Sequence, residues 1–246
     1  MARGSRETLA MAPHMPALTP DLPQTEIAIV ALTNAFRREN KLGEVRPNAA
    51  LAKAARAFAE YLARTNSFSH SADGRQPADR IKAAGYAYCD YAENLALNLD
   101  SRGFETRALA GQVVEGWKES PGHRKNMLTP HATEIGVGIA KAPDEPRYLS
   151  VQIFGRPQSE IYSFKIANRT ERDVNYEFLS KPYQIKSNYT ITHTVCIPGA
   201  LQIEGAGGTS VKAATGRFEA SSGRVFTLRP EKGGRVKVEV SSEPAK

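Results

Sequence analysis

Hydrophobic residues in the first half of the chain recur at the spacing of one face of an α-helix. The clearest stripe runs from Leu51 through Phe58 to Leu62 and follows Asn48, a residue type that often caps the start of a helix. Ser120, which is followed by proline, is expected to cap the start of another helix. Proline at a first helical position predicts short helices at residues 77–82 and 121–128, in addition to those that the spacing predicts at residues 26–41, 49–65 and 106–119.

Two strands are predicted after these helices. Residues 135–140 are apolar and interrupted by glycine, whereas residues 148–154 place Leu149, Val151 and Ile153 on one face and the intervening residues on the other. Helices that come first and strands that come later favour an α+β fold over an alternating βαβ sheet.

From residue 157 onward the pattern changes to simple alternation, which is typical of β-strands. Tyr162, Phe164 and Ile166 alternate with smaller or polar residues, and residues 174–178 and 189–196 alternate in the same way. Short strands separated by glycine-containing turns predict a small all-β domain, either a sandwich or a barrel. His193 shares the apolar face of its strand and is expected to be a core or interface histidine rather than a ligand.

Composition narrows the functional classes. The 246 residues carry a net charge of +7 that is spread over both halves, so a nucleic-acid-binding tract is not indicated. No run approaches the roughly 18 apolar residues that a transmembrane helix needs. Residues 1–23 lack the apolar stretch of a signal peptide and are expected to form a flexible arm. The two cysteines permit one disulfide or two free thiols.

Three short polar strings interrupt the apolar patterns and contain the candidate chemistry. They are residues 68–71 with His70, residues 92–95 with Glu93, and residues 120–127 with His123. Two histidines and a carboxylate suit a metal site or acid–base catalysis. Taken singly, each residue also fits an ordinary role, such as a backbone hydrogen bond for a histidine or an arginine pair for the glutamate.

Together these strings resemble a known family. The order FSH (68–70), AEN (92–94), Trp117, SPGHRKNM (120–127) and a final strand YLSVQIFG (148–155) resembles the CAP superfamily, also called the SCP domain. The segment DGRQPADRIKAAGY (73–86) is similar to the bacterial branch in particular. The resemblance covers residues 24–156 and implies an α-β-α sandwich with a central antiparallel sheet and a large surface cleft.

The resemblance also implies the site. His70 and His123 correspond to the family's metal ligands, usually for zinc or another divalent cation, and Glu93 would orient a histidine or a bound water. Asn94 and Ser120 would lie in the same cleft. Many animal and plant members carry a second glutamate where this chain has Ser120, which weakens an acid–base pair more than it weakens metal binding.

Three functions remain open at this point. The first is an exported, periplasmic or extracellular protein that binds a metal, and a lipid or small ligand, without catalysis. The second is a hydrolase in the same cleft, with Ser69 or Ser120 as the nucleophile beside His123 and Glu93. The third is an adhesion or interaction module that acts on a protein or surface through residues 157–246, behind the cleft domain of residues 24–156.

Since one cysteine lies in each half, a bridge between Cys89 and Cys196 would hold the β-rich part near the rim of the cleft. Free thiols are the alternative.

Overall fold

The computed structural model describes residues 17–204, 206–207 and 216–243, and residues up to 157 form its first half. The helices of this half are α1 (Leu22–Glu39), α2 (Ala49–Thr65), α3 (Pro77–Ala83), α4 (Thr106–Glu119) and α5 (Pro121–Met127). Its strands are β1 (Arg46–Pro47), β2 (Tyr88–Leu99), β3 (Glu134–Lys141) and β4 (Arg147–Pro157). Every helix predicted from the sequence is present, but β2 was not predicted.

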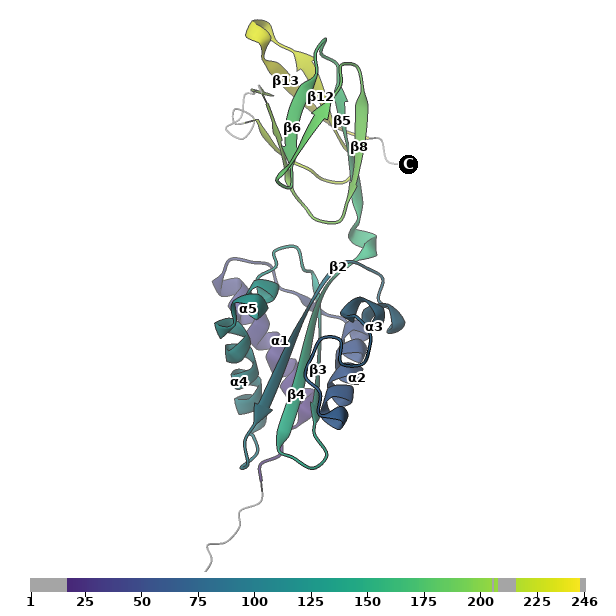
Figure 1. Ribbon diagram of the computed structural model, residues 1–246. Helices are drawn as coiled ribbons and strands as arrows, with labels where there is room; N and C mark the ends of the chain where they lie inside the picture. Colours follow the sequence, from purple (N-terminus) through teal and green to yellow (C-terminus); the bar gives the residue numbers. More distant parts are fainter. Residues whose placement is uncertain (1–16, 205, 208–215, 244–246) are drawn as a thin grey trace, which may run out of the picture.

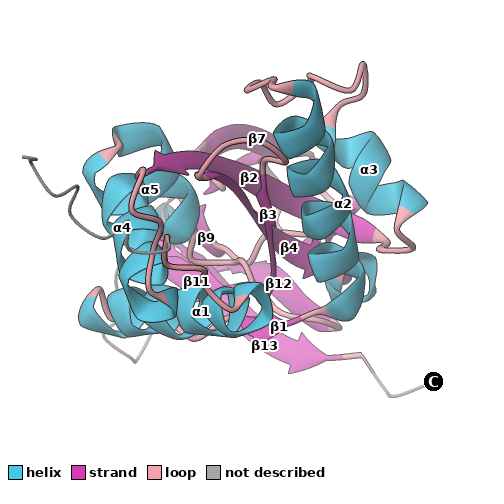
Figure 2. Cartoon of the chain, turned by 90° about the horizontal axis from the view of Figure 1, so that it is seen from below, coloured by secondary structure: helices cyan, strands magenta, loops and turns pink. Residues whose placement is uncertain are grey.

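The four strands form one sheet in the order β1-β3-β4-β2, in which β4 pairs antiparallel with both β3 and β2. Helices α1, α4 and α5 cover one face, and α2 and α3 cover the other (Figures 1 and 2). The predicted α-β-α sandwich with an antiparallel sheet is therefore confirmed. Strand β2 lies at the edge of the sheet, a position that matters for the site described below.

Most of the predicted flexible arm lies outside the described residues. Within them, Leu18 forms a β-bridge with Gly103 and α1 begins at Leu22, so this part of the arm is held against the fold. No helix in the described ranges has the length and apolarity needed to cross a membrane.

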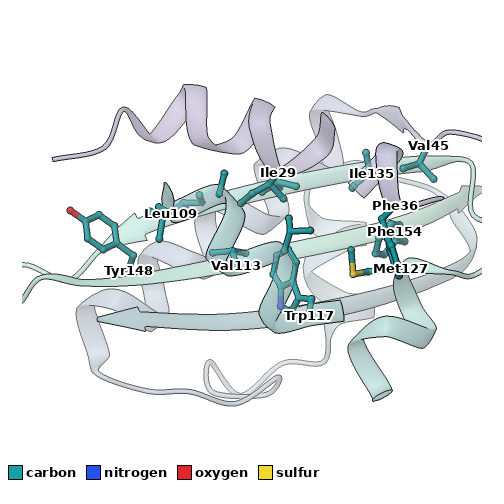
Figure 3. Packing of buried hydrophobic residues seen from close by; sticks show 14 of the residues in the cluster. Ile29, Phe36, Val45, Leu109, Val113, Trp117, Met127, Ile135, Tyr148 and Phe154 are labelled. Atoms are coloured by element: carbon teal, nitrogen blue, oxygen red, sulfur yellow. The ribbon is translucent and has the colours of Figure 1, made fainter. Parts of the chain in front are cut away.

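Trp117 lies at the centre of the core between the sheet and helices α1, α4 and α5 (Figure 3). Its ring packs in the same cluster as Ile29, Val113 and Phe154, and all four side chains are almost fully buried. The indole Nε1 donates a hydrogen bond of 2.9 Å to the backbone oxygen of Leu95 in β2. This bond fixes the edge strand against α4.

On the opposite face, α2 lies directly on the backbone of β3 because the strand carries glycine where α2 crosses it. A Cβ atom at Gly138 would overlap the backbone of Arg56, and one at Gly136 would overlap the backbone of Ala52. Backbone atoms of a packed helix cannot yield as a flexible side chain can, so the helix would have to move as a unit.

Gly138→Ala is expected to lower the free energy of unfolding by about 1–3 kcal/mol, the usual cost of overpacking. The matched control is Gly116→Ala in α4, where nothing lies within 4 Å of the new Cβ atom. Alanine in an open helix position should raise stability by about 0.5–1 kcal/mol. Urea unfolding of the two variants measures both effects, and a stabilised Gly138→Ala protein would contradict the close approach.

The β-rich half, from residue 158 onward, has a core of its own. It is built on strands β5 (Tyr162–Asn168), β6 (Val174–Phe178), β7 (Lys181–Ile185), β8 (Thr190–Val195), β9 (Ala200–Ile203), β10 (Ala206–Gly207), β11 (Arg217–Glu219), β12 (Arg224–Pro230) and β13 (Val236–Ser242), with single turns of 3-10 helix at Gln158–Glu160 and Lys232–Gly234. The two sheets have the orders β10-β13-β12-β5-β8 and β11-β9-β6-β7. Phe164, Phe178 and Phe226 fill the space between them, which confirms the predicted extra β-rich region.

His193 lies among aromatic rings of this core, as its alternation with apolar residues suggested. Its ring stacks on Phe164, with 5.0 Å between centroids, and its Nε2 lies 2.8 Å from the hydroxyl of Tyr176. Burial lowers the pKa of His193. These contacts are those of a packed core histidine.

The two halves are stacked end to end in Figure 1 and are joined at two places. The chain passes from β4 to β5 through one short turn, and Cys89 at the start of β2 forms a disulfide with Cys196, immediately after β8. Beside the disulfide, the buried Arg156 donates to the backbone oxygen of Cys196 at 2.7 Å and pairs with Glu160 at 2.8 Å. The division of the chain at residue 156 remains a prediction.

Candidate functional site

His70 lies in the loop between α2 and α3, and its orientation is set by Glu93 of β2. The Nδ1 atom of His70 is 2.8 Å from Oε1 of Glu93. The imidazole is half exposed, whereas the glutamate side chain is almost fully buried. A carboxylate on Nδ1 favours the tautomer with the proton on that nitrogen, which leaves the lone pair of Nε2 available. No described residue contacts this Nε2 through a hydrogen bond.

Glu93 is itself held by Arg80 of α3, a residue that the sequence analysis did not single out. Nη2 of Arg80 lies 3.0 Å from each carboxylate oxygen of Glu93, and it also donates to the backbone oxygen of His70 at 2.9 Å. Nη1 binds Asp73 at 2.9 Å. The guanidinium group is stacked over the ring of Phe58 at 3.5 Å. Arg80 therefore fixes the loop, the carboxylate and the histidine together.

His123 reaches the same edge of the sheet from the other layer of helices. Asn94 of β2 donates to the backbone oxygen of His123 at 3.2 Å and to Gln152 of β4 at 2.9 Å. Asn126, one turn along α5, donates to Oδ1 of Asn94 at 2.8 Å and to the backbone oxygen of Glu93 at 3.3 Å. These amides fasten α5 to β2 and set the position of His123.

Because successive side chains of a strand point to opposite faces, Glu93 and Asn94 serve opposite layers. Glu93 contacts the α2–α3 side and Asn94 contacts the α5 side, so His70 and His123 are held from the two sides of the edge strand. Burial lowers the pKa of His123, and the charge of His70 lowers it further. The lowered pKa favours the neutral form of His123, in which an imidazole can bind a metal.

Neither of the two serines considered as nucleophiles is hydrogen-bonded to His123 in the described structure. Ser69 accepts a hydrogen bond from the backbone of Ser71, and Ser120 joins α4 to α5 without a capping hydrogen bond from its side chain. Ser120 is the N-cap residue of α5, as predicted, but it caps through its backbone oxygen, which accepts from the N–H of Arg124, and not through its side chain. Neither hydroxyl is hydrogen-bonded to the imidazole, so the geometry does not assemble a Ser–His–Glu triad.

Of the residues at this candidate site, only the two histidines are available as ligands for a divalent cation. Within the described ranges no three His, Cys, Asp or Glu side chains group together as a metal site. Glu93 is occupied by Arg80 and His70, which makes it an orienting residue rather than a ligand. The two imidazoles, with water in the other positions, are the ligand set that these residues could offer zinc.

A comparison with known families bears on this arrangement. The sequence model of the cysteine-rich secretory protein family, CAP, matches residues 30–154. The chain belongs to the CAP family. The matched segment includes the three strings that carry His70, Glu93 and His123, and it ends within β4.

Similar bacterial proteins are found by sequence and by structure. The uncharacterized protein YkwD of Bacillus subtilis is 36% identical over 118 residues, which cover 48% of this chain and 43% of that protein. An outer surface protein of Borrelia burgdorferi has a TM-score of 0.48 at 21% identity over 55% of this chain and 94% of that one. An extracellular protein with an SCP domain from Bacillus anthracis has a TM-score of 0.46 at 27% identity over 58% and 45%. The chain spans less than half the length of YkwD.

Proposed function

We propose that this CAP protein is a non-enzymatic binding module that holds a zinc ion, or a similar divalent cation, between His70 and His123. The observation that carries the proposal is the contact of 2.8 Å between Nδ1 of His70 and Glu93, because it turns a free Nε2 lone pair outward from a fixed ring. Arg80 restrains Glu93 and thereby lowers the entropy that His70 would lose on binding a metal.

Each residue has a separate role in this proposal. His70 and His123 supply imidazole ligands, Glu93 orients His70, and Asn94 positions the helix that carries His123. The metal would act as a Lewis acid or as a bridge to a ligand that brings its own donor atoms. The hydrolase alternative gains no support from the described residues, since neither Ser69 nor Ser120 is hydrogen-bonded to the imidazole of His123.

Export to an oxidising compartment is part of the proposal. The disulfide between Cys89 and Cys196 supports it, because such bonds persist outside the reducing cytosol.

The β-rich half is proposed to serve as an interaction module for a partner or surface. The test is a comparison of partner binding by the full chain with and without reduction of the disulfide.

Isothermal titration with Zn²⁺ tests the metal site. The wild-type protein is expected to bind one equivalent with micromolar affinity, and His70→Ala and His123→Ala are each expected to abolish binding because one imidazole alone cannot hold the ion. His131→Ala is the matched control, since His131 lies in the same half but pairs with Asp90. Equal affinity in the folded His70→Ala/His123→Ala protein, or no binding to wild type, would contradict the proposal.

A further inference from the structure

A cavity of about 330 Å³ lies between α2, α3 and the loop that joins them. Neither histidine lines it, so it is separate from the proposed metal site. One stripe of α2 forms a wall, because Lys53, Ala57, Tyr61 and Arg64 recur at the spacing of one helical face. The opposite wall is formed by the end of α3 and by the loop residue Arg75.

The rim of this cavity carries positive charge that the protein does not neutralise. Lys53, Arg64 and Arg75 are exposed, and among the described residues none of them forms an ion pair with a carboxylate. The one carboxylate in the lining, Asp73, is already bound to Arg80 at 2.9 Å and to the backbone N–H of Arg75 at 3.1 Å. Three cations therefore line a common hollow without a carboxylate partner among the described residues, although Arg64 also lies over the ring of Tyr61 at 5.8 Å.

Between the rim cations the lining includes several small apolar residues, which leave the hollow open. Ala54 and Ala57 of α2 face Ala83 and Ala84 at the end of α3, and the ring of Phe58 lies beneath them under the Arg80 guanidinium. The hydroxyl of Tyr61 donates to the backbone oxygen of Ala72, which holds its ring at the wall. A compact apolar group would be buried here while a charged group stays at the rim.

We propose that this cavity binds a small, water-soluble organic anion, a carboxylate or phosphate attached to a compact apolar group. The anionic group is held by Lys53, Arg64 and Arg75, and the apolar group lies against the alanines and the ring of Tyr61. Arginine guanidinium groups bind carboxylate and phosphate oxygens through paired hydrogen bonds, which suits two of the three cations. This site does not depend on the proposed zinc site.

The probe for the test is phenyl phosphate, titrated into metal-free, isotope-labelled protein and followed by amide chemical shifts and calorimetry. We expect saturable binding with shifts concentrated in residues 53–64 and 73–84. Inorganic phosphate should bind more weakly, because it cannot use the apolar interior. The Lys53→Gln/Arg64→Gln/Arg75→Gln protein should bind phenyl phosphate about tenfold or more weakly, since each lost charge removes a charge-assisted contact.

The matched control is Arg107→Gln/Lys141→Gln/Lys181→Gln, which removes three exposed and unpaired cations outside the cavity. It should retain wild-type affinity, whereas Ala57→Leu should lose binding by filling the hollow without changing the charge. Equal loss in the control would show attraction to net charge alone and would overturn the proposal. So would the absence of saturation in wild type, or binding to phosphatidic acid vesicles without binding to phenyl phosphate.

Discussion

Replacing Arg80 by methionine is expected to lower the free energy of unfolding by about 3–5 kcal/mol, the usual cost of leaving a buried charge without its partner. Arg80 and Glu93 are both almost fully buried, and the guanidinium binds both carboxylate oxygens. Methionine keeps much of the volume over Phe58 but leaves the carboxylates of Glu93 and Asp73 without a cation. Urea unfolding followed by the fluorescence of Trp117 measures the change.

A double-mutant cycle separates the charge from the packing. Glu93→Gln removes the buried charge, so Arg80→Met/Glu93→Gln should be destabilised by clearly less than the sum of the two single variants. Arg102→Met is the control, because Arg102 forms its ion pair with Asp100 on the exposed surface and should change little. Strictly additive effects of Arg80→Met and Glu93→Gln would contradict a direct pairing.

Removing the disulfide by Cys89→Ser/Cys196→Ser is the second change with a large expected effect. The bond closes a loop with a sequence separation of 107 residues. In the chain-entropy description, a loop of this size stabilises the folded chain by about 4–5 kcal/mol. Unfolding of the double-serine variant, followed by circular dichroism, is expected to occur at correspondingly lower denaturant concentration.

The reduced wild-type protein serves as the control and should unfold at the same denaturant concentration as the double-serine variant. Mass spectrometry after alkylation without reduction should find no labelled cysteine in the native protein. Two labelled thiols under these conditions would show that the cysteines are free. That result would remove the basis of the stability prediction and would also weaken the argument for export.

The helices were predictable because their apolar stripes are long and regular. The 12-residue strand β2 was not, since it mixes polar and apolar residues on both faces. Glu93 and Asn94 occupy positions where a strand in this layer would ordinarily carry core residues, and they are tolerated because Arg80 and Asn126 satisfy them. Both partners are distant in sequence or on another element, so no local pattern reveals them.

The histidines of the candidate site were found through the order of the motifs rather than through spacing. His70 and His123 are held from opposite helical layers, and a site shared between them depends on the position of β2 at the edge of the sheet. Little in the sequence indicated that Arg80 belongs to the candidate site. It is one charged residue on a short helix, beside Ile81, and the structure shows that both are buried. Its bidentate contact with Glu93 depends on the tertiary fold and could not be deduced from the sequence.

The two connections between the halves also limit how one half can rotate relative to the other and how a pulling force passes between them. A single peptide link would let the β-rich half swivel freely about the long axis. The turn after β4 and the disulfide at Cys196 are two separate anchor points, so a rotation of the β-rich half about the long axis would have to strain one of them. Cutting the turn with a protease would leave the halves tethered. A pull on the far end of the β-rich half would be shared between β4 and the first residues of β2, the strand that carries Glu93 and Asn94.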